Sequence, residues 1–154
     1  MSRRRAGDPP GHVRYAGEFR WEGVDVHPYK VEGTHFRGVT RQLLFADSSA
    51  ASELRYFEVA PAGHTTLERH QHAHQVVVVR GSGRVLTGDG VVAVAAFDLI
   101  CVPALVWHQF RAGEEAPLGF LCLVDRERDR PQRPDAQALA ALRRDAQIAD
   151  FIRV

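Results

Sequence analysis

The sequence has no long apolar run, little imbalance of charge and few cysteines. No apolar stretch approaches the roughly 20 residues of a membrane-spanning helix, and no signal core follows the arginines near its start. Lys and Arg number 20 against 19 Asp and Glu, so the formal charge of +1 does not attract nucleic acid or anionic lipid over a distance. We therefore expect a cytoplasmic protein without membrane or nucleic-acid partners, and we assign no role to the basic run Arg3 to Arg5.

Several common chemistries are also missing. Cys101 and Cys122 both lie in apolar, strand-like runs, where a thiol behaves as a small hydrophobic side chain, so no structural disulfide is predicted. The chain has no CxxC, HExxH, P-loop or GxSxG motif. The segment "GSGRVL" has Leu86 where a dinucleotide-binding fingerprint needs its third glycine. The histidines remain as the candidates for a functional site.

The chain does provide the pattern of one all-β domain. Its 154 residues are 45% hydrophobic and 25% charged, which is ordinary for a soluble globular protein. From Leu54 onward, short runs of β-branched and aromatic residues recur between turn signals, as in an antiparallel sandwich or barrel. We predict an N-terminal arm with short edge strands at 1–53, a β-barrel at 54–125, and a linker with a C-terminal helix at 126–154.

The strands of the barrel follow from these runs. We expect one strand that ends at Pro61, followed by strands over 64–70 and 75–81 and a hairpin over 83–97 with its turn at Asp89 and Gly90. Three more strands are predicted, over 98–103, 108–113 and 117–124.

The last part of the chain loses the β pattern. "DRERDRPQRP", residues 125–134, is charged and contains proline, so we predict a surface linker without a packing role. Asp135 can then cap a single helix. The apolar face of that helix should pack on the barrel or on a partner, and it comprises Leu139, Leu142, Ala146, Ala149 and Ile152.

The segment "LERHQHAHQVVVV" is rich in metal-binding side chains. In one uninterrupted strand, Glu68, His70, His72 and His74 would all crowd onto one face, because side chains alternate. A bend at 71–73 is more plausible. It places Glu68 and His70 on one strand and His74 at the start of the next, with His72 in the turn and facing solvent.

Imidazole and carboxylate are good ligands for Fe, Mn, Ni, Cu or Zn, and a fixed ion needs three or four such donors at about 2.1 Å. His108 is the best candidate for a further donor, because apolar neighbours on both sides favour a ring that points inward. The other histidines lie among polar or irregular residues; they are His12, His27, His35 and His64.

These residues resemble the motifs of the cupin superfamily, double-stranded β-helix barrels with a central metal ion, over roughly 54–124. The family's first motif is Gly, five residues, His, one residue, His, three or four residues, Glu, six residues, Gly. Anchored on Gly81, its earlier positions fall on Ala62, Glu68, His70 and His74. The second motif, Gly, five residues, Pro, one residue, Gly, two residues, His, falls on Phe97, Pro103, Leu105 and His108.

The departures from the motifs are specific. Ala62, Phe97 and Leu105 replace glycines, which affects the expected turn geometry. The motif's Glu and one His have exchanged places, as Glu68 and His74, yet three histidines and one carboxylate are retained. Small one-domain cupins with His in the place of His74 form a subgroup of the family.

The resemblance implies one divalent transition-metal ion per chain (Fe, Mn, Ni, Cu or Zn) and a small organic substrate. The implied ligands are Glu68, His70, His74 and His108. Alternatively, Glu68 orients a ligating histidine and leaves a three-histidine site, as in the thiol dioxygenase branch of the superfamily.

Strand parity places Phe110 on the same face as His108, and the resemblance directs three side chains of a later strand toward the same cavity: Phe120, Cys122 and Val124. The substrate pocket is therefore expected at these four residues, with plain core packing as the alternative. Further polar contacts could come from Arg55, Tyr56 and Glu58.

Three functions follow from the resemblance. With Fe(II), the leading expectation is a mononuclear non-haem dioxygenase. With Mn, Ni or Zn, the same site suits a redox-neutral isomerase or lyase, in which unligated His72 or Glu68 would act as base. A non-enzymatic ligand-binding cupin is the third. We also expect a homodimer in which residues 31–46 are exchanged.

Overall fold

The computed structural model describes residues 11–30, 33–88 and 90–154, so Arg3 to Arg5 and Asp89 lie outside the described residues. The elements, in chain order, are β1 (Tyr15–Gly17), β2 (Arg20–Trp21), β3 (His27–Pro28), β4 (Arg37–Phe45), β5 (Ser52–His64), β6 (His74–Arg80), β7 (Ser82–Thr87), β8 (Gly90–Ala95), β9 (Leu99–Val102), β10 (Gln109–Ala112), β11 (Leu118–Asp125), α1 (Ala136–Leu142) and α2 (Ala146–Phe151).

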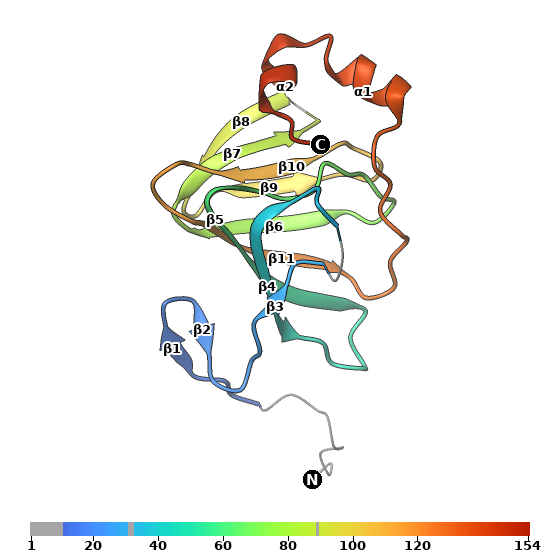
Figure 1. Ribbon diagram of the computed structural model, residues 1–154. Helices are drawn as coiled ribbons and strands as arrows, with labels where there is room; N and C mark the ends of the chain where they lie inside the picture. The colour runs from blue at the N-terminus through green and yellow to red at the C-terminus, as the bar shows by residue number, and fades with distance from the viewer. Residues whose placement is uncertain (1–10, 31–32, 89) are drawn as a thin grey trace.

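The main sheet is antiparallel and curls into a barrel (Figure 1). Its strands pair in the order β8-β7-β10-β5-β11-β6-β9, and β4 lies along β5 with β3 along β4. Each strand from β4 to β11 contributes a buried side chain to one apolar cluster. Because a flat sheet could not gather all of these strands around one core, the sheet has to wrap round it. The predicted all-β, double-stranded β-helix barrel is confirmed.

Alternating side chains fill the barrel. Val76 and Val78 of β6 are buried, as are Phe120 and Cys122 of β11, and each pair is two positions apart. The rings of Phe110 and Phe120 stack with centroids 4.4 Å apart. Each such side chain contributes about 1.5–3 kcal/mol when it leaves water.

Two strand predictions need correction. β5 does not end at Pro61 but continues to His64. Its pairing with β4 is irregular here, since Val59 and His64 pair with positions only two residues apart, so Pro61 lies in a bulge where no ladder donor is needed. The strand expected over 64–70 is mostly irregular, apart from two isolated bridges, Glu68 with His108 and Arg69 with Gln132.

The three positions where glycine is replaced keep a left-handed backbone. The φ angles are 58° at Ala62, 76° at Phe97 and 61° at Leu105. The turn geometry is therefore retained without glycine, at a strain of about 1–2 kcal/mol per residue. The β7–β8 hairpin also forms, with Thr87 opposite Gly90, although Asp89 of the expected turn lies outside the described residues.

The chain ends in two short helices rather than one. Asp135 caps α1 by accepting from the Ala138 amide, as expected, but Asp145 caps a second helix through the amides of Gln147 and Ile148. A new cap starts a new helix axis, which the apolar spacing alone does not reveal. The helices cover one end of the barrel (Figure 1), where they help bury a second cluster that includes Leu67, Leu86, Leu139, Leu142, Phe151 and Ile152.

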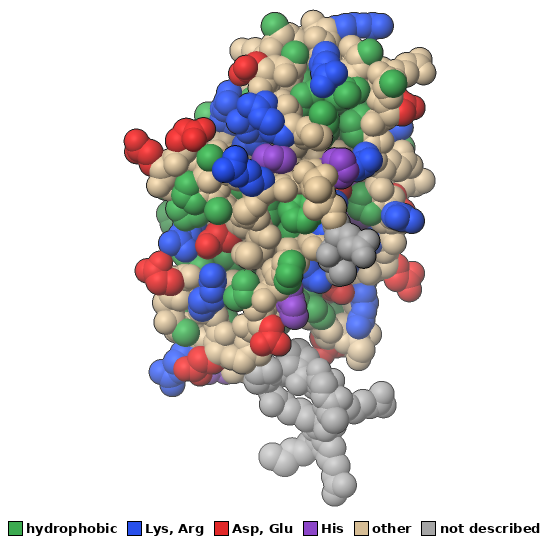
Figure 2. All heavy atoms as spheres, in the orientation of Figure 1, with side chains coloured by type: hydrophobic (Ala, Val, Ile, Leu, Met, Phe, Trp, Pro, Cys, Tyr) green, Lys and Arg blue, Asp and Glu red, His purple; other side chains and the backbone are tan. Residues whose placement is uncertain are grey.

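The N-terminal arm packs through aromatic contacts. The ring of Phe19 stacks on Tyr56 with centroids 5.5 Å apart. β4 pairs with β5 of its own chain, so the exchange of residues 31–46 between subunits stays a prediction. On the face seen in Figure 2, acidic and basic side chains are interspersed. Neither helix among the described residues has the length and apolar character needed to cross a bilayer.

Candidate metal centre

The two histidine motifs meet through their backbones. The amide of Glu68 donates to the carbonyl of His108 at 3.2 Å, and the amide of His108 donates back at 3.0 Å. The amide of Leu105 donates to the carbonyl of His70 at 2.7 Å. Segments about 40 positions apart in the sequence are thereby fixed side by side, and Glu68, His70 and His108 are buried together.

Backbone carbonyls fix the orientation of two rings. Nδ1 of His70 lies 2.6 Å from the carbonyl oxygen of His72, and Nδ1 of His108 lies 2.9 Å from that of Val106. A carbonyl only accepts, so Nδ1 carries the proton in both rings and Nε2 presents a lone pair. This is the arrangement by which proteins orient metal-binding histidines.

His74 approaches the same point from β6. Its Nε2 lies 2.7 Å from Nε2 of His70, and its Nδ1 lies 2.9 Å from the sulfur of Cys122. Two nitrogens at right angles around an ion, each at about 2.1 Å, would be about 3 Å apart. The close approach of a lone pair on His70 to another ring nitrogen therefore suits a cation.

Burial keeps these rings neutral. Together with the neighbouring histidines, it lowers the pKa of His70 to about 4 and that of His74 to about 2. Burial also lowers the pKa of His108. Only neutral imidazole binds a metal ion, so at neutral pH the rings are in the ligand form.

The carboxylate of Glu68 completes one donor group. One ligand atom each from Glu68, His70 and His108 lies within 4.8 Å of the others. Lys30 Nζ donates to Oε2 of Glu68 at 2.5 Å, and the hydroxyl of Tyr29 is 3.5 Å from Oε1. His74 belongs to a second such group, with His70 and His72, so His70 is the residue that the two groups share.

The prediction that His72 faces solvent was wrong. Only 9% of the surface of His72 is exposed to solvent, and its ring lies parallel to that of His70 with centroids 3.6 Å apart. Its ligand atom falls within 4.8 Å of those of His70 and His74. Nδ1 of His72 contacts Oδ1 of Asp129 at 2.8 Å, so a residue from the linker holds the ring inward. His72 is therefore a further possible donor.

The prediction of a linker without a packing role was also wrong: the linker docks on the histidine-rich segment of residues 69–72. Asp129 accepts from the amide of Gln71 at 2.8 Å and from that of His72 at 3.3 Å. The hydrogen bonds to these amides and to the His72 ring lower the pKa of Asp129 to about 2. The backbones of Arg69 and Gln132 pair at 3.0 and 2.8 Å. The charge and the prolines of the linker gave no sign of these contacts in the sequence.

Lys30 was not singled out either. It is the only lysine in a chain whose other basic residues are arginines, and it contacts Glu68 and Thr66. That it is the single lysine was the one feature of the sequence that could have pointed to it.

The expected substrate pocket is only partly present. Phe110, Phe120 and Cys122 line a cavity of about 30 Å³ together with His74 and His108. That volume suits about one water molecule. Val124 does not line the cavity and packs in the core instead. Among the other expected polar contacts, Arg55 lies opposite Cys122 in the ladder, whereas the Tyr56 hydroxyl donates to Glu58.

A larger cavity of about 610 Å³ is lined in part by Glu68. It has the size of a small-ligand site. Its lining residues are Lys30, Gly33, His35, Phe36, Thr66, Glu68, Arg130, Pro131 and Arg133.

Comparisons with known proteins agree with this fold. Residues 55–124 match the family described as Cupin domain. A curated protein of Rhodospirillum rubrum, named 1-methylthio-D-xylulose 5-phosphate methylsulfurylase, is 52% identical over 139 residues, which cover 90% of this chain and 89% of that protein.

Two solved structures are similarly related. A cupin 2 conserved barrel domain protein from Rhodopseudomonas palustris is 51% identical with a TM-score of 0.89, covering 93% of this chain and 99% of that one. A cupin-2 domain protein from Rhodospirillum rubrum is 52% identical with a TM-score of 0.83, covering 89% and 93%. The curled barrel with its inward-facing histidines and these matches lead to one conclusion: the chain belongs to the cupin superfamily.

Proposed function

We propose that Glu68, His70, His74 and His108 hold one divalent first-row transition-metal ion. The fixed tautomers of His70 and His108 and the short distance between the Nε2 atoms of His70 and His74 support this donor set. One carboxylate among three neutral rings leaves a formal site charge of about +1 for a divalent ion. His72 is the alternative fourth donor. In that case Glu68 would not bind the ion, and its carboxylate, paired with Lys30, would support the site from outside the ligand set.

We further propose that the protein is an enzyme that removes the methylthio group from a 1-methylthio ketose phosphate. The observation that carries this proposal is the 52% identity, over 90% of the chain, to the methylsulfurylase named above. When bound, a divalent ion supplies a Lewis acid that polarises a carbonyl oxygen of the substrate. That role is redox-neutral at the metal, as in the lyase alternative predicted from the sequence.

The reaction balances if a small thiol is the acceptor. The thiol sulfur attacks the methylthio sulfur, and the electron pair of the broken carbon–sulfur bond passes to C1 and the adjacent carbonyl. C1 then takes up a proton, and the thiol has lost one. The products are a 1-deoxyketose phosphate and a mixed disulfide. The protein's contribution is to orient the carbonyl end beside the histidines and to exclude water with the apolar wall of Phe110 and Phe120.

The dioxygenase expected from the sequence makes the opposite prediction about oxygen. Protein loaded separately with Mn(II), Fe(II), Ni(II) or Zn(II) is incubated with 1-methylthio-D-xylulose 5-phosphate and a small thiol, while mass spectrometry and an oxygen electrode follow the reaction. We expect loss of the methylthio group without oxygen uptake, with His70→Ala inactive. Oxygen consumption equal to turnover would favour the dioxygenase, and no turnover with any of the four metals would contradict the proposal.

We also propose a homodimer that forms through the outer face of the barrel. Leu99 is 78% exposed and Phe45 is 55% exposed, and they lie on β9 and β4 of the same sheet. Leu121 and Leu123 of β11 and Cys101 of β9 share with Leu99 a surface hollow of about 490 Å³. Sizing chromatography with light scattering checks the mass, and a monomer at micromolar concentration would contradict this proposal.

A further inference from the structure

The cavity beside Glu68 concentrates positive charge in a chain that is almost neutral. Three of its lining residues carry a full positive charge, namely Lys30, Arg130 and Arg133, and Glu68 is its one acid among the described residues. The carboxylate of Glu68 already faces Lys30. The whole chain has a formal charge of only +1, so this excess is local. A cavity of this kind attracts an anion.

Arg130 and Arg133 differ from the other arginines of their segment. Arg126 donates to the carbonyl of Asp47 at 2.8 Å, and Arg128 donates to the carboxylate of Glu53 at 2.8 Å. Within 11–30, 33–88 and 90–154, the side chains of Arg130 and Arg133 make no hydrogen bond or ion pair. Among the described residues, no acceptor occupies the donors of either guanidinium group.

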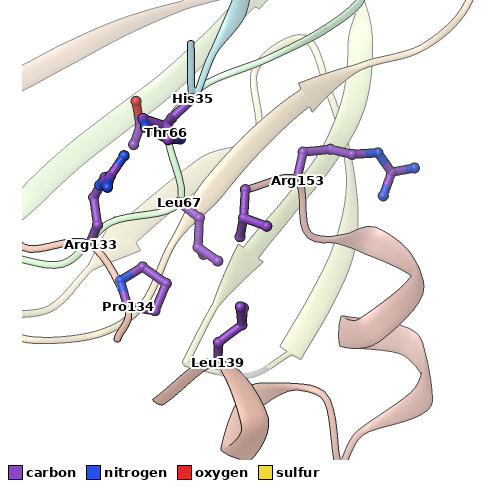
Figure 3. A pocket seen from close by; sticks show the side chains of 8 residues that line it. His35, Thr66, Leu67, Arg133, Pro134, Leu139 and Arg153 are labelled. Carbon is purple, nitrogen blue, oxygen red and sulfur yellow. The ribbon is translucent and has the colours of Figure 1, made fainter. Parts of the chain in front are cut away.

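Both arginines are positioned by their neighbours. Asp129 is bonded to the amides of Gln71 and His72, and the backbone of Gln132 is paired with Arg69. Each cavity arginine thus directly follows a residue that anchors the linker to the metal-binding segment. In Figure 3, the guanidinium of Arg133 is turned toward Thr66 and His35, whereas that of Arg153 points away. Thr66, His35 and Arg133 also line the larger cavity.

Lys30 links this cavity to the metal centre. Its ammonium group has three N–H donors. Two of them reach Oγ1 of Thr66 at 3.1 Å and Oε2 of Glu68 at 2.5 Å. The side chain is one-third exposed and lines the cavity, so a third donor is available to a ligand.

We propose that Arg130, Arg133 and Lys30 form the subsite that binds the phosphate group of the substrate. This inference rests on the proposed function, in that the ligand is a sugar phosphate. In a 2-ketose 5-phosphate the phosphate and the carbonyl are at opposite ends of the molecule. With the carbonyl end at the histidines, the phosphate end extends past Glu68 into the basic cavity. Planar guanidinium groups match phosphate oxygens in pairs, which gives both affinity and orientation.

The subsite is tested by binding and by kinetics with separate probes. Calorimetry measures the Kd of D-xylulose 5-phosphate, of D-xylulose and of inorganic phosphate for the Mn(II)-loaded protein. The variants are Arg130→Ala, Arg133→Ala and their double variant, with Arg144→Ala as the control that removes the same charge from an exposed helix-end residue outside the cavity. Circular dichroism checks that each variant is folded.

We expect the phosphorylated sugar to bind at least about tenfold more tightly than the free sugar. Each single variant should raise its Kd about tenfold, because a hydrogen bond to a charged group contributes roughly this much. D-xylulose should bind to the variants as it does to the wild type, and Arg144→Ala should change nothing. With 1-methylthio-D-xylulose 5-phosphate, the variants should raise KM more than they lower kcat.

The outcomes separate this inference from the proposed function. If D-xylulose 5-phosphate binding depends on both arginines but no methylthio sugar is turned over, the subsite stands and the proposed reaction fails. If the methylthio substrate is turned over but both variants keep the wild-type KM and Kd, the subsite is overturned and the reaction stands. A wild-type protein that binds none of the phosphate probes also overturns the subsite.

Discussion

The histidine-bearing segments of the barrel and the linker of residues 125–134 contrast in what determines their position. His74 projects inward from the first residue of β6, whereas His70 and His108 lie outside the named strands and are placed by the backbone hydrogen bonds that join their two segments. Asp129 and Arg133 acquire their positions only when the linker docks on the segment of residues 69–72. The barrel thus supplies the proposed metal donors, while the linker holds His72 inward and lines the neighbouring cavity.

The largest effect is expected at His70, which belongs to both groups of possible donors. Replacing it in His70→Ala should weaken metal binding by at least about a hundredfold, since loss of a residue that only supports a ligand already costs 10–100-fold. Metal content after dialysis, measured by mass spectrometry, checks this. The matched control is His27→Ala, which removes an exposed histidine of β3. Equal metal content in both variants would contradict the account of the barrel wall.

A second pair of variants decides between the carboxylate and the fourth imidazole. Glu68→Gln should weaken metal binding about a hundredfold, because the amide loses the charge of a ligand but keeps its shape. His72→Gln should weaken it about tenfold, as expected for a supporting residue. Metal titrations of both variants provide the measurement. The reverse order would place His72 among the ligands and Glu68 outside them.

The contribution of the linker is tested at Asp129. Asp129→Ala removes the acceptor of two amides and of the His72 ring, so the 71–73 bend should loosen. Metal affinity should fall about tenfold and the Tm should decrease. Glu127→Ala removes an exposed carboxylate of the same segment and serves as the control. If the two variants behave alike, the docked linker has no influence on the metal centre.

The smallest effect concerns backbone strain at the turn before β9. Phe97 has a φ of 76° and is 81% exposed, so Phe97→Gly loses little burial and removes the strain. Relief of about 1–2 kcal/mol, less the 0.5–1 kcal/mol that glycine costs in flexibility, should raise the free energy of unfolding by about 0.5–1 kcal/mol. Thermal or urea unfolding measures it.

Phe97→Ala is the matched control for that variant. It removes the same ring but keeps a side chain in the left-handed region, so it should not gain stability. A similar gain in both variants would show that the exposed ring, and not the backbone, is the source of the destabilisation.

The sequence predicted the elements whose positions are local and periodic. The barrel and the bend at 71–73 follow from alternation and turn signals. His70 is buried as expected, but it lies in an irregular segment held by backbone hydrogen bonds and not in the strand predicted over 64–70. His72 was misplaced because its burial depends on Asp129, more than 50 positions away. The second helix was missed because Asp145 looks like any exposed acid until its carboxylate caps the amides of Gln147 and Ile148.

The central claim is that Glu68, His70, His74 and His108 coordinate a single ion inside the barrel. Anomalous diffraction from crystals grown with Mn(II), Fe(II), Ni(II) or Zn(II) tests it most directly. We predict one anomalous peak per chain, bonded to Nε2 of the three histidines and to an oxygen of Glu68. A peak bonded elsewhere, a His108 ring turned away from the other three donors, or no peak with any of these metals would contradict the account.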